Sequence, residues 1–183
     1  MKKLNLLLGA IALAVVALIS FSFKVEKPTT SLSTMVTDWE RAKAYTLDYI
    51  NAATPEAIAL KPTAEMRSFG QQMLHIAEAN YGIAAVAGGK ESPIAFGQLE
   101  KASDQYKTKE ALVKAVSDSY DFAISTLKGM DEAKMTEKIK LFNYDLTRGA
   151  AFEKAFEHQT HHRGQTTVYL RLSGLTPPNE RLF

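Results

Sequence analysis

Four histidines are the residues in this sequence whose type and spacing could do chemistry: His75, His158, His161 and His162. His158 and His162 are four positions apart, so on a helix they lie one turn apart and can share a metal ion. A third imidazole from another helix would give three nitrogen ligands and leave one coordination position open. An open divalent site acidifies bound water or binds an anionic substrate atom, which is typical of a catalytic metal centre.

Helix geometry separates these histidines into two groups. A helix turns by about 100° per residue, so His158 and His162 fall about 40° apart, at the centre of an inward apolar face. His161 falls at the rim of that face, where a solvated surface histidine is expected. His75 lies on a different helix, at the edge of its apolar face and beside small residues that let a partner helix approach. His75, His158 and His162 are therefore the candidate metal ligands, and three histidines packed in a core are the alternative.

Three further polar residues lie near this cluster in the helical pattern. Glu78 follows His75 by one turn, where its carboxylate could orient an imidazole or simply face solvent. Gln165 and Tyr169 continue the face of the histidine pair, where they could hydrogen-bond a ligand or border the core. The pattern leaves both roles open for each of them.

Several other kinds of site are excluded. A di-iron centre in a helical bundle needs Glu-x-x-His pairs, and no glutamate stands three positions before any of the four histidines. The sequence has no Gly-x-Ser-x-Gly, Walker-type or Gly-x-Gly-x-x-Gly motif, which excludes the common serine-hydrolase, P-loop and dinucleotide patterns. It has no cysteine either, so disulfides, thiolate catalysis and iron–sulfur clusters are excluded, and metal ligands must be His, Asp or Glu.

Size and charge indicate one ordinary globular domain without a nucleic-acid surface. The chain has 183 residues, of which 46% are hydrophobic and 23% are charged, and this suits a single domain. Its 22 basic and 20 acidic residues give a net charge of +2. Lys2 and Lys3 account for that excess and lie in a removable N-terminal segment, so no basic footprint for nucleic acid remains.

The N-terminus has the pattern of an export signal. A short basic start is followed by residues 4–23, which are almost entirely apolar and end in small residues. This pattern is typical of a secretory signal peptide, although about 20 apolar residues would also serve as an uncleaved anchor. We therefore predict an exported protein, periplasmic or secreted, that touches a membrane only if the leader is retained. The predicted segments are a leader over residues 1–22, a linker over 23–34 and a folded domain over 35–183.

Four amphipathic stretches, separated by glycine and proline, predict an all-α fold after the hydrophobic leader helix. Thr37 with Glu40, and Ser68 with Gln71, have the spacing of capping boxes before the first and second stretches. The four expected helices cover about residues 38–53, 69–87, 108–128 and 149–172. Helices of this length predict a four-helix bundle.

The connections between these helices differ in length. The second and third helices are joined by about 20 residues, which is longer than a tight hairpin needs. This segment is expected to be a long crossover connection or a lid. Residues 138–142 could add a short extended piece to the third connection.

Two motifs resemble the DinB/YfiT-like superfamily. The stretch HQTHHRGQ at residues 158–165, followed by the Pro-Pro pair at 177–178, resembles the C-terminal signature of that family. The stretches KPT at 61–63 and MRSFG at 66–70, followed by His75, resemble the entry into its second helix. The resemblance covers about residues 35–183, and the combination of the two motifs is what makes it specific.

The resemblance implies a four-helix bundle with a long crossover and a divalent metal, often zinc or nickel, held by three histidines. Carried over by position, the ligands are His75, His158 and His162. The family's His-x-x-x-His ends at the histidine before Arg-Gly-Gln, which selects His162 over His161. The helix-face geometry makes the same selection.

The resemblance also implies a range of activities. Members of known activity are thiol-dependent transferases or isomerases, and others are described as metal-dependent hydrolases. Low-molecular-weight thiols are scarce outside the cytoplasm, so the export leader favours hydrolysis here. We expect a metal-dependent hydrolase or group transferase for an unidentified small molecule, with a homodimer left open. A noncatalytic metal-binding or interaction bundle is the alternative.

Overall fold

The computed structural model describes residues 30–183 of the chain. The predicted leader and most of the predicted linker therefore lie outside the described residues. Within residues 30–183, no helix is both long and apolar enough to span a membrane. The elements in chain order are α2 (Leu32–Ala52), α3 (Pro55–Ala59), α4 (Phe69–Gly88), α5 (Gln98–Lys101), the 3-10 helix η1 (Ser103–Tyr106), α6 (Lys109–Lys128), the 3-10 helix η2 (Glu132–Thr136), β1 (Lys138–Leu141), β2 (Tyr144–Thr147) and α7 (Arg148–Leu172).

Helix α2 begins six residues before the predicted start. Ser31 is its N-cap, and the Ser31 side chain accepts a hydrogen bond from the Thr34 backbone amide at 3.2 Å. The predicted capping box at Thr37 is wrong, because this residue lies inside the helix and its hydroxyl donates to the Ser33 carbonyl. The earlier start buries Met35 one turn before the buried Trp39, which extends the apolar face of the helix toward the N-terminus.

The other long helices begin and end within one residue of prediction. The capping box before α4 is confirmed: Ser68 Oγ accepts from the Gln71 amide at 3.2 Å, and Gln71 Oε1 accepts from the Ser68 amide at 2.9 Å. Gly89 ends α4 in the left-handed conformation, with φ of 63°, which glycine adopts without a steric penalty. Thr108 and Thr147 cap the starts of α6 and α7 in the same way as Ser68 caps α4.

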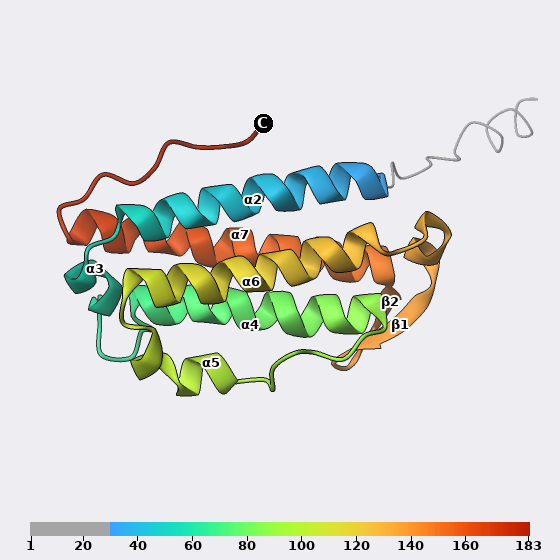
Figure 1. The fold of residues 1–183 in the computed structure, drawn as a ribbon, viewed down its shortest axis with the longest axis horizontal. Helices are drawn as coiled ribbons and strands as arrows, with labels where there is room; N and C mark the ends of the chain where they lie inside the picture. The colour runs from blue at the N-terminus through green and yellow to red at the C-terminus, as the bar shows by residue number, and fades with distance from the viewer. Residues whose placement is uncertain (1–29) are drawn as a thin grey trace, which may run out of the picture. The chain divides into compact units, whose positions relative to one another are not determined.

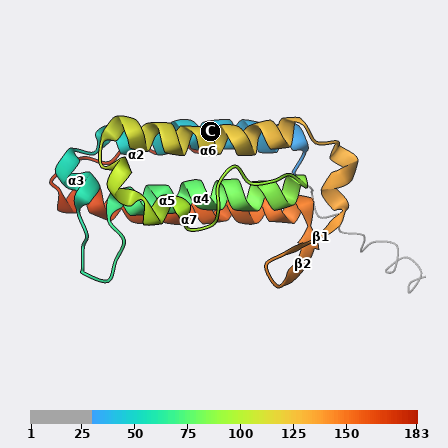
Figure 2. The ribbon, with the colours of Figure 1, turned by 60° about the horizontal axis from the view of Figure 1, so that its bottom comes forward.

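The four long helices pack side by side in two layers. Figures 1 and 2 show α2 beside α6 in one layer and α4 beside α7 in the other. Helices α4 and α6 run in the same direction, so the segment between them has to return along the whole length of the bundle. This segment, residues 89–108, carries α5 and η1 past the outer side of α4 (Figure 1). The predicted long connection is therefore a crossover.

A small antiparallel hairpin precedes α7. Strand β1 lies in the segment predicted to be extended, and β2, which was not predicted, pairs with it from Lys138 opposite Thr147 to Leu141 opposite Tyr144. The fold is therefore helical except for these two short strands. After the hairpin, the first residue of α7, Arg148, donates to the Ala87 carbonyl at 2.7 Å and so joins the start of α7 to the end of α4.

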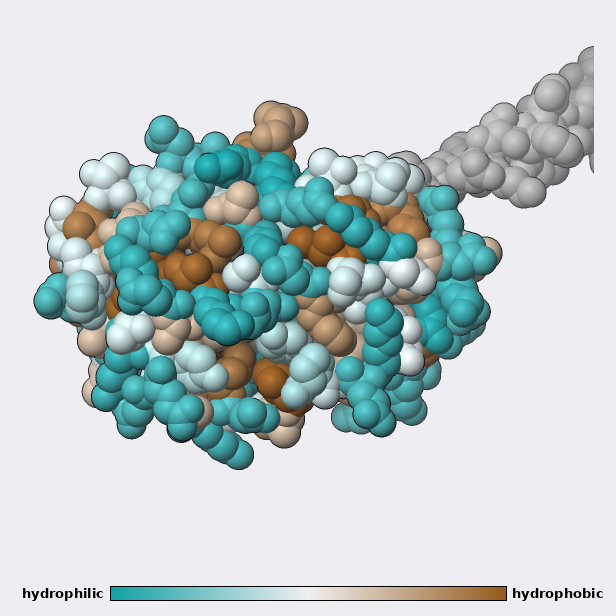
Figure 3. Space-filling view, in the orientation of Figure 1, coloured by the Kyte–Doolittle hydropathy of each residue, from teal (hydrophilic) through white to brown (hydrophobic). Residues whose placement is uncertain are grey.

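The core between the layers is filled by large apolar side chains from all four long helices. On the molecular surface that Figure 3 shows, apolar side chains form separate patches within a hydrophilic surface. Polar side chains are also buried in the core, and Arg163 is the largest of these: it hydrogen-bonds Gln159 and lies over the Tyr45 ring, 4.6 Å from its centroid. The largest fully buried side chains are Trp39, Tyr120, Tyr169, Phe69, Phe152, Ile50, Met73, Leu74, Ile76, Leu112, Leu127 and Leu170.

Candidate metal centre

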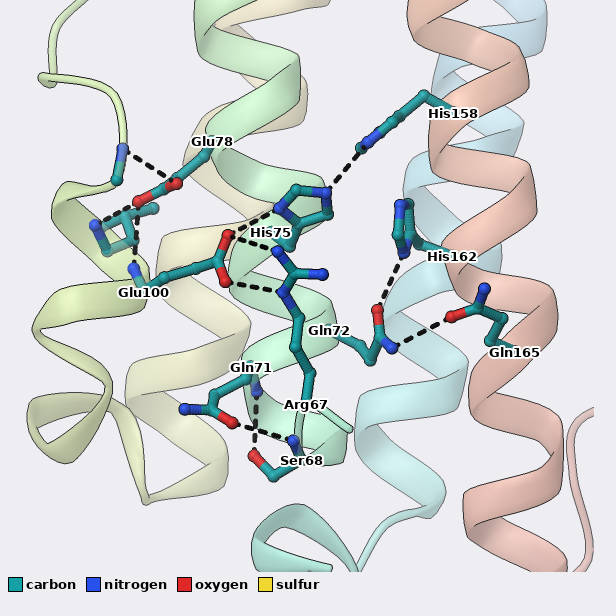
Figure 4. Close-up of polar contacts among 12 residues, drawn as sticks. Arg67, Ser68, Gln71, Gln72, His75, Glu78, Glu100, His158, His162 and Gln165 are labelled. Atoms are coloured by element: carbon teal, nitrogen blue, oxygen red, sulfur yellow. Dashed lines mark hydrogen bonds and ion pairs between the residues drawn. The ribbon is translucent and has the colours of Figure 1, made fainter. Parts of the chain in front are cut away.

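The structure brings His75 of α4 together with His158 and His162 of α7. One potential ligand atom from each lies within 4.8 Å of the other two, and the Nε2 atoms of His75 and His158 are 3.2 Å apart. Two nitrogens bound to one tetrahedral zinc at 2.0–2.1 Å would be about 3.3 Å apart. Figure 4 shows the rings of α4 and α7 turned toward one another. The spacing of the cluster therefore fits shared coordination.

A carboxylate from the crossover orients His75. His75 Nδ1 lies 2.6 Å from Glu100 Oε1, and because a carboxylate only accepts hydrogen bonds, Nδ1 carries the proton and the lone pair of Nε2 faces His158 in the cluster. Arg67 holds the same carboxylate at 2.7 Å. Burial alone would raise the pKa of Glu100, but hydrogen bonds from Arg67 and His75 outweigh it and lower that pKa. A histidine between a carboxylate and a cluster centre is the arrangement found around metal-ligating imidazoles.

A glutamine orients His162 in the same sense. His162 Nδ1 donates to Gln72 Oε1 at 2.8 Å. The amide nitrogen of Gln72 donates to Gln165 Oε1 at 3.0 Å and to the Tyr169 hydroxyl at 3.3 Å. With Nδ1 occupied as a donor, the Nε2 lone pair of His162 is free to bind a cation.

His158 has the least satisfied ring of the three. Its Nδ1 is buried and has no hydrogen-bond partner among the described residues, and its Nε2 meets only His75. Burial, followed by the neighbouring charge of His75, lowers the pKa of His158 to about 4. Burial, followed by His158 and His75, lowers the pKa of His162 to about 3. Both rings are therefore neutral at neutral pH, the state that a metal ligand requires.

Glu78 has neither of the roles considered from the sequence. Glu78 is 3% exposed, and its two carboxylate oxygens accept hydrogen bonds from the backbone amides of Gly97, Leu99 and Glu100. These contacts fix the start of α5 against α4, and so they position the Glu100 carboxylate that meets His75. Glu78 thus acts on the cluster through the backbone of the crossover (Figure 4).

The structure also places the other candidates. His161 is exposed, accepts a hydrogen bond from the Gln165 amide at 2.8 Å and lies outside the group that could share an ion, as its position at the rim predicted. Tyr169 is 1% exposed and donates to the Arg67 carbonyl at 2.9 Å. Gln165 is partly buried and links His161 to Gln72, so Gln165 borders the core beside the cluster, whereas Tyr169 lies within the core.

Sequence reasoning missed Arg67, Gln72 and Glu100 as parts of this site. Gln72 could have been found, because it lies one turn before His75 on the face turned toward α7. Glu100 carries no such signal, since its place depends on the irregular path of the crossover. Arg67 precedes α4, and only its partner Glu100 identifies its role.

The cluster borders a cavity of about 450 Å³. His75 and His158 line one end of it, and the rest of the wall comes from α4, from the crossover and from the tip of the hairpin. Cavities of this size are typical of small-molecule sites. The histidines are therefore accessible to a ligand from this side.

The sequence matches the model of the DinB family over residues 27–181. An uncharacterized protein, YrdA of Bacillus subtilis (strain 168), is 23% identical over 154 residues, which are 81% of this chain and 86% of that protein. A DinB-like protein from Bacillus cereus ATCC 10987 is 19% identical with a TM-score of 0.70, covering 84% of this chain and 99% of that one. A DinB-like protein from Bacillus subtilis, YjoA, is 20% identical with a TM-score of 0.61, covering 81% and 96%. These two solved structures share the fold.

Proposed function

The chain belongs to the DinB family, and on this premise we propose that His75, His158 and His162 bind one divalent metal ion, Zn²⁺ or Ni²⁺. The observation that carries the proposal is the convergence of three ligand atoms within 4.8 Å. The donor set supports it, because three imidazoles suit zinc and nickel. The neutral state of His158 and His162 at neutral pH supports it too, since a metal ligand has to be deprotonated.

We infer that the site is open and catalytic. Three protein nitrogens leave a coordination position for water or substrate, and the cavity lies against His75 and His158. A divalent ion bound there supplies Lewis-acid polarisation and acidified water. The proposed activity is therefore that of a metal-dependent hydrolase or group transferase.

The protein's own residues hold this site in shape. Glu100 keeps the proton of His75 on Nδ1, and Gln72 does the same for His162. Glu78 lines the cavity and Glu100 contacts His75, but hydrogen bonds already occupy the oxygens of both carboxylates. Their role is to orient groups, because neither carboxylate is left free to remove a proton from a substrate.

The predicted leader bears on the choice of reaction. We propose that the protein is exported through residues 1–22, and low-molecular-weight thiols are scarce outside the cytoplasm. Hydrolysis of an ester or amide is therefore the preferred reaction over thiol transfer. The alternative is a noncatalytic module in which the ion only joins α4 to α7. The cavity beside the cluster favours catalysis, because a purely structural ion needs no open face.

Metal content tests the ligand set directly. We expect elemental analysis to find about one metal ion per chain in the wild-type protein and none in His75→Ala or His162→Ala. His161→Ala is the matched control, because it removes a neighbouring imidazole that lies outside the group able to share an ion, and it should retain the ion. Equal loss from His161→Ala and His162→Ala would overturn the assignment.

A second measurement separates the enzyme from the structural module. Purified, metal-loaded protein is tested on ester, amide and thiol-electrophile substrates beside His162→Ala. Turnover by the wild-type protein alone supports the enzyme. Metal binding that raises the melting temperature, without turnover of any of these classes, supports the structural module.

A further inference from the structure

The cavity beside the histidine cluster is elongated along α4. His75, Ala79, Gly82 and Val86 all line it, and their spacing of four, seven and eleven positions from His75 places them on one face of the helix. At 1.5 Å per residue, this stripe extends about 16 Å from the histidine. The cavity is therefore a trough that begins at the cluster and follows three turns of the helix.

The floor of the trough is made of small residues. Ala79 and Gly82 stand where long side chains would fill the space, and a Cβ built on Gly82 meets no atom within 4 Å. Glycine inside a helix costs roughly 0.5–1 kcal/mol relative to alanine. Neither a turn nor a close backbone approach requires glycine at position 82. The effect of having no side chain there is to leave the trough open.

The walls of the trough are apolar and come from two other segments. Ile94 and Phe96 belong to the crossover, and Leu141 and Phe142 belong to the hairpin tip. At the mouth, Phe96 is 76% exposed and Phe142 is 69% exposed. Phe142 also has a φ of 54°, a conformation that is uncommon for a bulky residue. Two large rings are thus left in water, where an apolar guest would cover them.

Apart from Glu78, the polar side chains that line the trough lie toward its ends. His75 and His158 stand at one end, and Lys90 and Ser92 stand toward the end of α4. Between them only Glu78 is polar, and its oxygens are occupied by backbone amides of the crossover. A guest with a hydrophilic body would lose its hydration there without finding partners.

We propose that the trough binds the alkyl or acyl chain of the substrate and presents its polar, reactive end to His75 and His158. The statement that the polar end reacts rests on the proposed function, whereas the statement that the trough binds an alkyl chain does not. A membrane surface or a second copy of the protein could also cover exposed aromatic rings. The alkyl chain of a small molecule is favoured, because the apolar surface continues inward to the histidines as a cavity instead of ending as a flat patch.

Binding of straight-chain carboxylates tests the proposal. Octanoate, decanoate and dodecanoate are titrated calorimetrically into the purified protein, and the affinity is expected to rise roughly fourfold for each added methylene that is buried. Gly82→Leu should lower the affinity for dodecanoate at least tenfold, because the new side chain occupies the trough. Gly164→Leu is the matched control, because this helical glycine is exposed and a Cβ built on it also meets no atom within 4 Å. The affinity of this variant for dodecanoate should stay at the wild-type value.

The same titration on His162→Ala distinguishes the two proposals. His162 does not line the trough, so the dependence on chain length should persist even where the metal ion is lost. If the wild-type protein binds no metal but its affinity still depends on chain length, the proposed function is overturned and the trough is not. Affinities that do not change with chain length, or that are equal in Gly82→Leu and wild type, would overturn the trough. Two other results would also overturn the trough if the affinity does not depend on chain length. They are cosedimentation with phosphatidylcholine vesicles, or dimerisation of the protein, that is lost when Phe142 is replaced.

Discussion

The three imidazoles of the cluster differ in what holds their outer nitrogens. His75 donates to the charged carboxylate of Glu100, His162 donates to the neutral amide of Gln72, and His158 has no such partner among the described residues. A carboxylate behind an imidazole raises its basicity and fixes its tautomer. Of the three proposed ligands, His75 is therefore the one whose strength depends most on its neighbour.

Replacing Glu100 should weaken metal binding without removing a ligand. Glu100→Gln keeps the size of the side chain but takes away the negative charge behind His75, so the affinity is expected to fall about 10–100-fold. Competition with a chromophoric chelator measures it. Glu110→Gln, on the exposed first turn of α6, is the control for loss of one negative charge, and equal affinities in the two variants would refute the role of Glu100.

Acid should destabilise the metal-free protein through the same cluster. The pKa values of His158 and His162 are about 4 and about 3 in the folded protein, against about 6.5 in an unfolded chain. Between these values the unfolded state binds more protons, so the stability falls as the pH decreases below about 6.5. Urea unfolding of chelator-treated protein at pH 7, 6 and 5 measures this fall, in a range where most carboxylates stay ionised.

A double variant isolates the contribution of the two histidines. His158→Gln/His162→Gln removes both titrating rings, and its urea midpoint should change less with pH than that of the wild-type protein. Parallel profiles for the two proteins would show that other groups cause the acid sensitivity.

At the scale of elements, α4 carries most of the site, and its small residues serve different purposes. Gly82 opens the trough, whereas Gly88 allows α4 to approach α6: a Cβ on Gly88 would lie 2.2 Å from Thr126 Cγ2. Thr126 is fully buried and branched at Cβ, so it cannot rotate away at low cost.

These two glycines should respond oppositely to the same substitution. Gly88→Ala is expected to destabilise the protein by about 1–3 kcal/mol through overpacking. Gly82→Ala is expected to stabilise it by about 0.5–1 kcal/mol, because its Cβ meets no atom and the helix loses less backbone entropy. Chemical denaturation of the two variants beside wild type provides the comparison. A destabilising Gly82→Ala would mean that the trough is closed in solution.

Helix ends and faces were predictable from the sequence because they depend on local residues. The capping box at Ser68 and the inward face of His158 and His162 follow from spacing along one helix. The start of α2 was missed because both Ser31 and Thr37 have N-cap chemistry, and burial of Met35 decides between them.

The parts of the site that lie in the crossover were not predictable. Glu100 is positioned because three backbone amides at the start of α5 and just before it donate to the buried Glu78 carboxylate, and no periodicity marks an irregular segment. The trough depends in the same way on the crossover and the hairpin tip, whose Phe96 and Phe142 both line it, and their placement beside α4 requires the tertiary fold. The sequence thus predicts the cluster but neither the residues that orient it nor the cavity beside it.

At the scale of the whole molecule, the cluster joins segments that are far apart in the chain. His75 comes from α4 and His162 from α7, and Glu100 ties the crossover to the same point. An ion that binds only this folded arrangement stabilises the protein by mass action. The proposed ion would therefore couple two helices and the crossover into one cooperative unit.

Removing the metal should lower the melting temperature by a predictable amount. At a free metal concentration about 1,000-fold above the dissociation constant, the stabilisation is about 4 kcal/mol. For a domain of this size it corresponds to roughly 8–16 °C. Differential scanning calorimetry with and without a chelator measures the shift, which should be absent in His162→Ala and complete in His161→Ala. A full shift in His162→Ala would mean that the stabilising ion binds elsewhere, because three convergent imidazoles cannot lose one member without a loss of affinity.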